Sequence, residues 1–305
     1  MPLPLLSIIS VNYNHSHVTD ELLDSIYRHN TYSNIEIIVV DNASTINPVP
    51  NWQQKYPDVL FIRSEKNLGF AGGNNLGLSY ANGTYFFLVN NDTEFTPLLI
   101  ETLLHTLETH PQVGVVCPKI KYFQLPDTLQ YVGFTPMNYY TCQNKCVGQF
   151  EKDNGQYDNR EAPTGFAHGA AMMLKKEAVA KAGLMHENYF LYYEEGDWCD
   201  RIKKQGFEIW VNTKALIYHK ESVSVGQKSA LKEYFMNRNR ILFIRRNAPY
   251  HCKLFFLFYF ILIVTPKNIV IYIKEGKSVF IKQLVRAIYW NITQPTNSVH
   301  LGFKP

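Results

Sequence analysis

Short runs of apolar, β-branched residues alternate with helix-like stretches through the first third of the chain, and this alternation constrains the fold most. The apolar runs predict five strands, at residues 5–11, 35–40, 59–62, 85–89 and 113–116. The stretches between them predict helices at 18–29, 71–80 and 96–110, the last capped by Thr96 with Pro97 in its first turn. This order predicts an α/β fold: a doubly wound, largely parallel, mixed sheet with helices on both faces.

Polar residues follow four successive predicted strands. They occupy positions 12–14, 41–44, 67–75 and 90–92. Right-handed crossovers place the carboxyl ends of parallel strands along one edge of a sheet, where ligands bind. A single Asn or Asp is more often a turn or a helix cap, but four such groups together indicate a ligand site. The glycines at 69–77 are compatible with a phosphate-binding helix start, yet they match neither the dinucleotide fingerprint nor the Walker A pattern.

Two acidic positions suggest chemistry at this edge. Asp92 follows the fourth predicted strand and is a natural hard ligand for Mg²⁺ or Mn²⁺. Segment 190–201 holds four acids within seven positions, among aromatic residues, and runs into a short predicted helix at 202–205. Acids suit a solvated helix start because they complement its dipole. An aromatic wall would instead raise a carboxyl pKa and suit a general base.

Taken in order, these motifs resemble the family 2 inverting glycosyltransferases of GT-A fold, and in particular the bacterial rhamnosyltransferase-like members. The motifs are Val11-Asn12-Tyr13-Asn14, Val40-Asp41-Asn42 with Ser44, Asn67-Leu68-Gly69-Phe70 with Gly72-Gly73-Asn74, Asn90-Asn91-Asp92, and Glu194-Glu195-Gly196-Asp197. The resemblance covers roughly residues 5–245. It implies a GT-A catalytic domain at 1–230, with a nucleotide-binding half at about 1–118 and an acceptor half at about 119–230.

The resemblance also implies roles for individual residues. The nucleotide-binding residues would be Val11, Asn12, Tyr13, Asp41, Gly73, Asn74 and Asn91. The metal ligands would be Asp92 and His219, and the sugar and acceptor would lie along His168, Gly169 and Ala170. Glu195 would be the catalytic base, with Glu194 as the alternative, while Asp197 would position the base or cap the following helix.

The implied reaction is the transfer of a hexose, rhamnose-like by family character, from a dTDP- or UDP-sugar to a hydroxyl group. The acceptor would be a glycan or a lipid-linked saccharide in cell-surface polysaccharide synthesis, and the cofactor Mg²⁺ or Mn²⁺, with no organic cofactor. Two alternatives stay open. A nucleotidyltransferase on a similar sheet would carry a basic loop after the first strand, which positions 12–15 lack. An inactive saccharide-binding or scaffold protein would not need Asp41, Asp92 and Glu195.

Charge is divided unevenly along the chain. Residues 232–305 hold 12 Lys and Arg against two Glu, whereas the rest holds 18 basic and 24 acidic residues. The acidic body argues against nucleic-acid binding. The basic part predicts a helical, cationic extension at 231–305, separate from the catalytic domain.

The extension contains an apolar run at 254–264 that stops at 265–268 and resumes at 269–273. Eleven residues are too few to span a bilayer, which needs about 20. With basic residues throughout 245–290, the pattern predicts peripheral docking on an anionic membrane. A helical subdomain packed on the body, or an interface with a second copy, are the alternatives. The start of the chain lacks the features of a signal peptide, which favours the cytoplasm and the inner face of the plasma membrane.

Overall fold

A computed structural model describes residues 3–220 and 229–303, and its centre is a mixed sheet. In the described chain this sheet has ten strands. They are β1 (Leu6–Asn12), β2 (Ile35–Asp41), β3 (Val59–Arg63), β4 (Tyr85–Val89), β5 (Thr93–Phe95), β6 (Val113–Tyr122), β7 (Leu129–Tyr131), β8 (Glu161–Pro163), β9 (Ala171–Lys175) and β10 (Glu208–His219). All five predicted strands are present, and the fifth continues to Tyr122.

The sheet joins two parallel blocks through one antiparallel strand. Its order is β3-β2-β1-β4-β9-β6-β10-β5, with β7 paired to β6 and β8 to β10. Strands β1 to β4 are parallel to their neighbours in that block, β6 is parallel to β10, and β9 runs opposite to both β4 and β6. Because β9 is reversed, its first residue, Ala171, lies beside Val89 at the carboxyl end of β4. The turn before β9 therefore joins the edge at which the parallel strands end.

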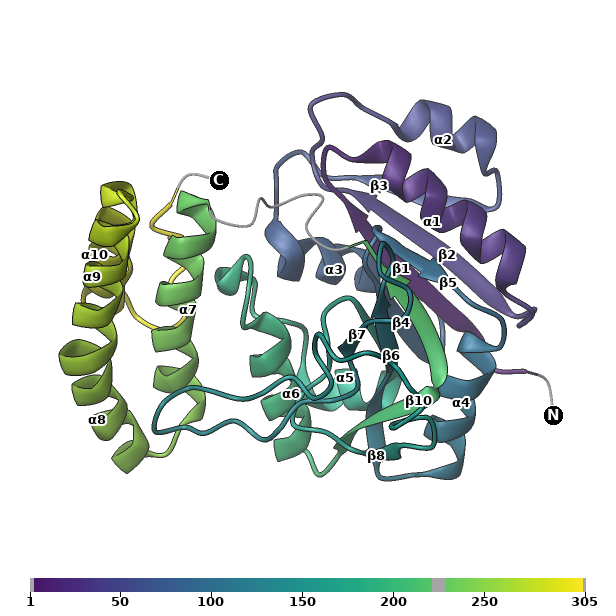
Figure 1. Ribbon diagram of the computed structural model, residues 1–305. Helices are drawn as coiled ribbons and strands as arrows, with labels where there is room; N and C mark the ends of the chain where they lie inside the picture. Colours follow the sequence, from purple (N-terminus) through teal and green to yellow (C-terminus); the bar gives the residue numbers. More distant parts are fainter. Residues whose placement is uncertain (1–2, 221–228, 304–305) are drawn as a thin grey trace.

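Helices cover the sheet and add a layer beyond it (Figure 1). They are α1 (Ser16–His29), α2 (Val49–Lys55), α3 (Gly69–Tyr80), α4 (Leu99–Thr109), α5 (Lys176–Ala182), α6 (Glu194–Lys204), α7 (Ala230–Asn247), α8 (Tyr250–Tyr259), α9 (Thr265–Lys274) and α10 (Ser278–Thr293). Helix α3 packs against β1 and β2, and α4 against β6 and β10. A Cβ at Gly77 would lie 2.4 Å from Ile9 Cγ2, so this glycine permits the close approach of α3 to β1.

Three local predictions differ from the structure. Thr96 does not cap α4: its hydroxyl donates to the Leu216 carbonyl, and the helix begins after Leu98, past Pro97. Helix α6 begins at Glu194 rather than at 202, since the acidic segment itself forms its first turn. The sequence pattern also misses α2, which is seven residues long and buries only Trp52. At Thr96, the contact with Leu216 outweighs the local capping pattern.

The C-terminal helices form a separate layer, in which α7 lies between the sheet domain and α8–α10 (Figure 1). The predicted interruption at 265–268 is wrong, because one helix runs from Tyr250 to Lys274. Pro266 has no N–H and crowds the carbonyl four residues earlier. The preceding turn, Phe260–Val264, widens into a π-helical turn, which accommodates the proline without ending the helix. By length and composition, this helix meets the requirement for crossing a membrane.

Candidate active site

The buried amide of Asn12 joins the loops at the ends of three strands. Its Nδ2 donates to Asp41 Oδ1 (2.9 Å) and to Ser44 Oγ (3.0 Å), and its Oδ1 accepts from Thr19 Oγ1 (3.1 Å). Asn91 Nδ2 donates to the Thr19 hydroxyl oxygen at 3.0 Å and to Asn12 Oδ1 at 3.4 Å. The network forms because β1 and β2 end in register, with Asn12 opposite Asp41. The amides of Asn12 and Asn91, predicted to bind nucleotide, are therefore used to hold the loops.

The carboxylate of Asp41 is fully buried and paired with a residue that the sequence analysis did not identify. Arg63 Nη1 donates to Asp41 Oδ2 at 2.6 Å, and Arg63 Nη2 donates to the Ser44 carbonyl at 2.8 Å. Such pairing offsets the cost of burying a charge. Arg63 lies opposite Asp41 in the β2–β3 register, and its side chain is 34% exposed. Arg63 could have been identified as a site residue from the sequence, because it directly follows the predicted third strand.

The other residues of the predicted nucleotide site surround the start of α3. A Cβ at Gly73 would lie 2.8 Å from Val11 Cγ1, so Gly73 allows the helix to pack on β1. Asn74 is buried, and its Nδ2 donates to the Phe70 carbonyl within the helix. The ring of Tyr13 is partly exposed at the end of β1. Within this group, Tyr13 offers a surface that a ligand can reach, whereas Gly73 and Asn74 serve the packing and bonding of α3.

Asp92 and His219 meet at the far side of the same edge. Strand β5 pairs with β10 so that His219 lies opposite Thr93, and His219 Nε2 is 3.0 Å from Asp92 Oδ1. His219 Nδ1 is 2.9 Å from Gln130 Oε1. An amide oxygen can only accept, so Nδ1 carries the hydrogen and Nε2 of the neutral ring bears a lone pair. Among the described residues no donor satisfies the buried Asp92 Oδ1.

Two lone-pair atoms that face each other at this distance fit a shared divalent cation. A carboxylate oxygen and an imidazole nitrogen suit Mn²⁺, and the carboxylate suits Mg²⁺. Gln130 fixes the His219 ring as an outer partner does in metal sites. No third Asp, Glu, His or Cys joins Asp92 and His219 in the described parts of the chain. Substrate phosphate oxygens and water would complete such a site. Gln130 has no sequence signal, because it comes from the short strand β7.

The turn that leads into β9 supplies a neutral histidine beside this pair. The rings of His168 and His219 have centroids 6.2 Å apart. Burial, and then the neighbouring His219, hold the pKa of His168 down to about 3. His168 Nδ1 accepts from the Ala170 backbone N–H at 3.1 Å, so the ring hydrogen resides on Nε2. The Asn90 N–H donates to the Ala170 carbonyl (2.9 Å), which ties this turn to the loop that carries Asp92.

Gly169 brings the same turn next to the predicted base. A Cβ at Gly169 would lie 3.8 Å from Glu195 Oε1 and 3.6 Å from Phe70 Cζ, with no nearer atom. The predicted sugar and acceptor residues thus lie between the Asp92–His219 pair and Glu195. The structure brings together the predicted metal, sugar and base residues, although they come from β4, β9, α6 and β10.

The two adjacent acids at the start of α6 lie in a low-polarity environment. Glu194 is buried and Glu195 is half-buried, and neither Oε2 has a hydrogen-bond partner among the described residues. Burial raises the pKa of both carboxyls, and the nearby Glu195 raises that of Glu194 further. A raised pKa brings a carboxylate closer to the basicity that proton abstraction requires. Glu195 is the better placed of the two because it faces Gly169.

The loop before these acids has strained backbone. Phe190, Tyr192 and Tyr193 have φ of +64°, +72° and +73°, a region that bulky residues rarely adopt. The amide of Asn239 on α7 holds this loop through three hydrogen bonds of 2.7–2.9 Å. The acceptors are the carbonyl oxygens of Tyr189, Leu191 and Tyr192. Asn239 therefore positions the two acids, and the sequence analysis did not identify it.

Asp197 lies in a different environment from Glu194 and Glu195. Its Oδ1 accepts from Tyr189 Oη (3.2 Å) and Asn247 Nδ2 (2.8 Å), and its Oδ2 accepts from Arg201 Nε (3.0 Å). No side chain caps the start of α6, so the predicted capping by Asp197 is wrong. The buried carboxylate instead ties α6 to the end of α7.

The chain is similar to known proteins in sequence. Residues 7–183 match the family model described as Glycosyl transferase family 2. The low-salt glycan biosynthesis hexosyltransferase Agl10 of Haloferax volcanii is 27% identical, covering 78% of this chain and 74% of the relative. The N-acetylglucosaminyl-diphospho-decaprenol L-rhamnosyltransferase of Mycobacterium tuberculosis is 21% identical, covering 71% of this chain and 76% of the relative.

Solved structures share the fold. The mannosyltransferase PcManGT from Pyrobaculum calidifontis, in complex with GDP-Man and Mn²⁺, has a TM-score of 0.58 at 14% identity, covering 96% of this chain and 88% of that one. S. aureus TarS 1–349, in complex with UDP-GlcNAc, has a TM-score of 0.61 at 15% identity, covering 94% and 80%. The predicted GT-A fold is confirmed. The chain belongs to glycosyl transferase family 2 and is a glycosyltransferase that takes its sugar from a nucleotide-sugar donor.

Proposed function

We propose that the chain is an inverting hexosyltransferase that moves a rhamnose-like sugar from a dTDP- or UDP-sugar to a hydroxyl of a glycan or lipid-linked acceptor. It would act at the cytoplasmic face of the membrane in the synthesis of a cell-surface polysaccharide. Two relatives support this choice: one is named as a glycan-biosynthesis hexosyltransferase, and the other as an L-rhamnosyltransferase acting on a decaprenol-linked sugar. Each aligns with about three-quarters of its own length.

One observation carries the proposal: the Glu195 carboxylate faces, through Oε1, the Gly169 turn next to the Asp92–His219 pair, while its Oε2 is buried without a hydrogen-bond partner among the described residues. The Glu195 carboxylate takes the proton of the acceptor hydroxyl, and the hydroxyl oxygen attacks the anomeric carbon from the face opposite the diphosphate. The new carbon–oxygen bond forms as the bond to the diphosphate breaks, so the configuration inverts and the nucleoside diphosphate leaves. The His168 Nε2–H can donate to a sugar or phosphate oxygen from the same turn.

Asp92 and His219 are the residues that would hold the divalent cation, and Gln130 would keep the His219 ring in place. When bound, the cation supplies positive charge that offsets the charge on the leaving diphosphate. On the nucleotide side, Tyr13 and Arg63 offer an aromatic ring and a guanidinium next to the buried Asp41.

The acceptor fits a pocket of about 340 Å³ between α7 and the α9–α10 pair, with Tyr193 at its border. Tyr193, the residue directly before Glu194, lines this pocket together with Lys232, Asn237 and Arg240 of α7. Arg240 Nε has no acceptor among the described residues. Tyr193 directly precedes the helix that carries Glu195, so it connects this pocket to the segment of the proposed base.

The test measures thermal unfolding of the purified protein with UDP, dTDP, GDP or CMP, each with and without Mn²⁺. A ligand at 100 times its Kd adds about 2.7 kcal/mol, or roughly 4 °C in a chain of this size. We expect UDP or dTDP to stabilise, and Mn²⁺ to increase the effect. Asp92→Asn should abolish the Mn²⁺-dependent part alone, and the exposed Asp127→Asn should change nothing.

The alternatives give different results in the same assay. A preference for nucleoside triphosphates over diphosphates would point to a nucleotidyltransferase, and no response to any nucleotide would point to an inactive saccharide-binding protein. For an active preparation, NMR of the product at the anomeric carbon distinguishes inversion from retention. Retention of configuration would contradict the mechanism proposed here.

A further inference from the structure

The outer helices carry an exposed apolar surface that is unusually extensive for a water-facing one. It covers the outward sides of the Tyr250–Lys274 helix and of α10. Leu262 is 67% exposed, Ile263 56%, Ile273 64% and Ile292 77%. Scattered exposed apolar residues need no explanation, but a contiguous patch of this kind marks an interaction surface.

The same helix has a second side that is fixed to the protein. Cys252, Phe256, Phe260 and Val264 are buried at a spacing of four residues, which places them on one line along the helix. Further along, the Tyr272 hydroxyl donates to Glu233 of α7. A helix held in this way along its length lies against the protein. Its free side can therefore contact a partner with the helix axis parallel to the partner's surface, and the helix does not insert across it.

Charge identifies the partner. From residue 248 to the end, the chain has seven Lys and Arg and one acid, Glu275. Lys253, Lys267 and Lys274 lie on the helix that carries the apolar stripe. Apolar side chains bordered by cations match the acyl boundary and phosphates of an anionic bilayer. A second copy fits less well, because a two-fold interface would bring two surfaces of net positive charge together.

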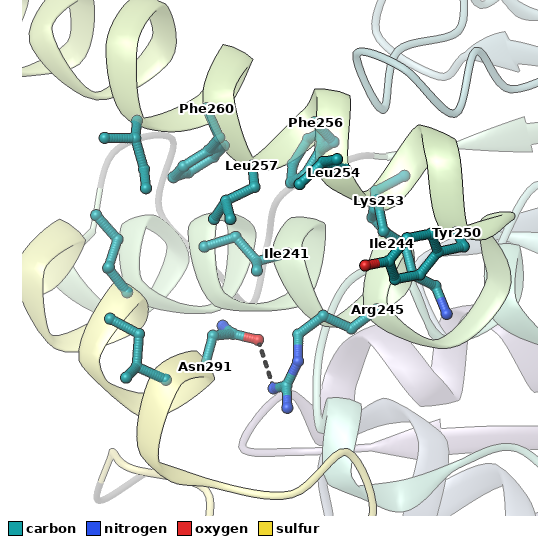
Figure 2. A pocket seen from close by; sticks show the side chains of 13 residues that line it. Ile241, Ile244, Arg245, Tyr250, Lys253, Leu254, Phe256, Leu257, Phe260 and Asn291 are labelled. Carbon is teal, nitrogen blue, oxygen red and sulfur yellow. Dashed lines mark hydrogen bonds between the residues drawn. The ribbon is translucent and has the colours of Figure 1, made fainter.

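A groove of about 350 Å³ runs between α7, α8 and α10 and is almost wholly apolar (Figure 2). Ile241 and Ile244 line it from α7, and Leu257 lines it from α8. Arg245 and Lys253 lie at one end, where Arg245 Nη1 donates to Asn291 Oδ1 at 3.2 Å. An apolar trough that ends in two cations fits a hydrocarbon chain attached to a phosphate.

We propose that the outer faces of α8, α9 and α10 form a docking surface for an anionic lipid bilayer. The groove takes one acyl chain, and Arg245 with Lys253 meets the phosphate. Two helical layers then lie between the bilayer and the active site: the α8–α10 layer, and helix α7, whose Phe243 faces Tyr193. Each helix is about 10–12 Å wide with its side chains, so the base lies about 20 Å from the bilayer, and the acceptor sugar must extend that far from its lipid.

The test is flotation of the purified full-length protein with vesicles of phosphatidylcholine alone or with 30% phosphatidylglycerol, without donor or acceptor. Omitting both substrates separates this proposal from the proposed chemistry. We expect flotation with the anionic vesicles only. The double variant Leu262→Asp with Ile292→Asp should lose it by about tenfold or more. The matched control, Ile46→Asp with Leu125→Asp, alters equally exposed apolar residues on the catalytic body and should float like the wild type.

A second pair of variants tests the groove. Arg245→Gln with Lys253→Gln should weaken binding to the anionic vesicles by about tenfold or more. Lys152→Gln with Lys214→Gln removes two exposed cations of the body and should leave binding unchanged. Equal flotation with neutral and anionic vesicles, or wild-type flotation of the Leu262/Ile292 variant, would overturn the proposal. A third result would also overturn it: the wild type sediments as a dimer and binds no vesicles, and the Leu262/Ile292 variant sediments as a monomer. The apolar face would then be an interface with a second copy.

Discussion

The edge of the sheet and the outer helical layer present opposite surfaces. At the edge, polar groups are buried and held at defined distances, as in the Asp92–His219 pair and the network around Asn12. On α8–α10, apolar groups are exposed, and the cations among them come from flexible lysines. The first surface suits chemistry, which depends on the position of single atoms. The second suits adhesion, which depends on summed area and charge.

This difference predicts that single substitutions have large effects at the edge and small effects on the outer layer. A large loss of binding from one substitution on α8–α10, or full activity after a substitution at the sheet edge, would contradict this difference.

Glu195→Gln should lower the transfer rate by about 10²–10⁴-fold and leave donor binding intact. Burial raises the pKa of Glu195, and a base works only when ionised. The wild-type rate should therefore fall as the pH decreases through a midpoint above the usual 4.5. Initial rates across pH, with donor binding measured separately, check both points. Glu194→Gln is the comparison: if it abolishes transfer and Glu195→Gln does not, Glu194 is the base.

Asn239→Ala should destabilise the protein by about 2 kcal/mol, because it removes the two amide N–H groups that three carbonyl oxygens of the loop before α6 share. Urea unfolding measures this change. For stability, Asn237→Ala is the control on the same helix, since its amide donates to Glu233 one turn earlier and not to the loop before α6. In addition, kcat should fall more than the donor KM rises, because the strained loop carries the acids. If the two variants have equal free energies of unfolding, Asn239 does not position the loop.

Gln130→Ala should weaken Mn²⁺ binding by about 10–100-fold, since Gln130 keeps the hydrogen of His219 on Nδ1 and the lone pair on Nε2. Titration of activity and of thermal stability with Mn²⁺ measures the shift. Gln130→Glu also accepts from Nδ1 and should retain most of the affinity. Unchanged Mn²⁺ dependence in Gln130→Ala would mean that His219 is not a ligand.

Lys267→Gln should have the smallest effect, about 1 kcal/mol or roughly fivefold in binding to anionic vesicles. Its transfer rate on a short, water-soluble acceptor should equal that of the wild type. Lys214→Gln on β10 provides the matched control. A loss of a hundredfold or more from this one lysine would show a specific lipid site, and not a surface that acts by summed charge.

Much of the fold could be predicted because it depends on local patterns. The β-branched runs of β1 to β4 and the polar residues after them indicate parallel strands and a ligand edge without any tertiary information. The motifs at 90–92 and 194–197 identified the acids that the structure brings to one site. Helix boundaries failed where a distant contact decided them, as with Thr96, whose hydroxyl bonds to Leu216.

What the sequence could not predict depends on pairing between distant strands and helices. Gln130 reaches His219 because β7 and β10 both pair with β6, and Arg63 reaches Asp41 through the register of β2 and β3. Asn239 holds the loop before α6 from a helix some fifty residues away. Charge, apolar surface and backbone preference belong to each residue and can be read along the chain. Which residues are buried, hydrogen-bonded or face each other depends on neighbours in space, so these properties follow from the fold alone.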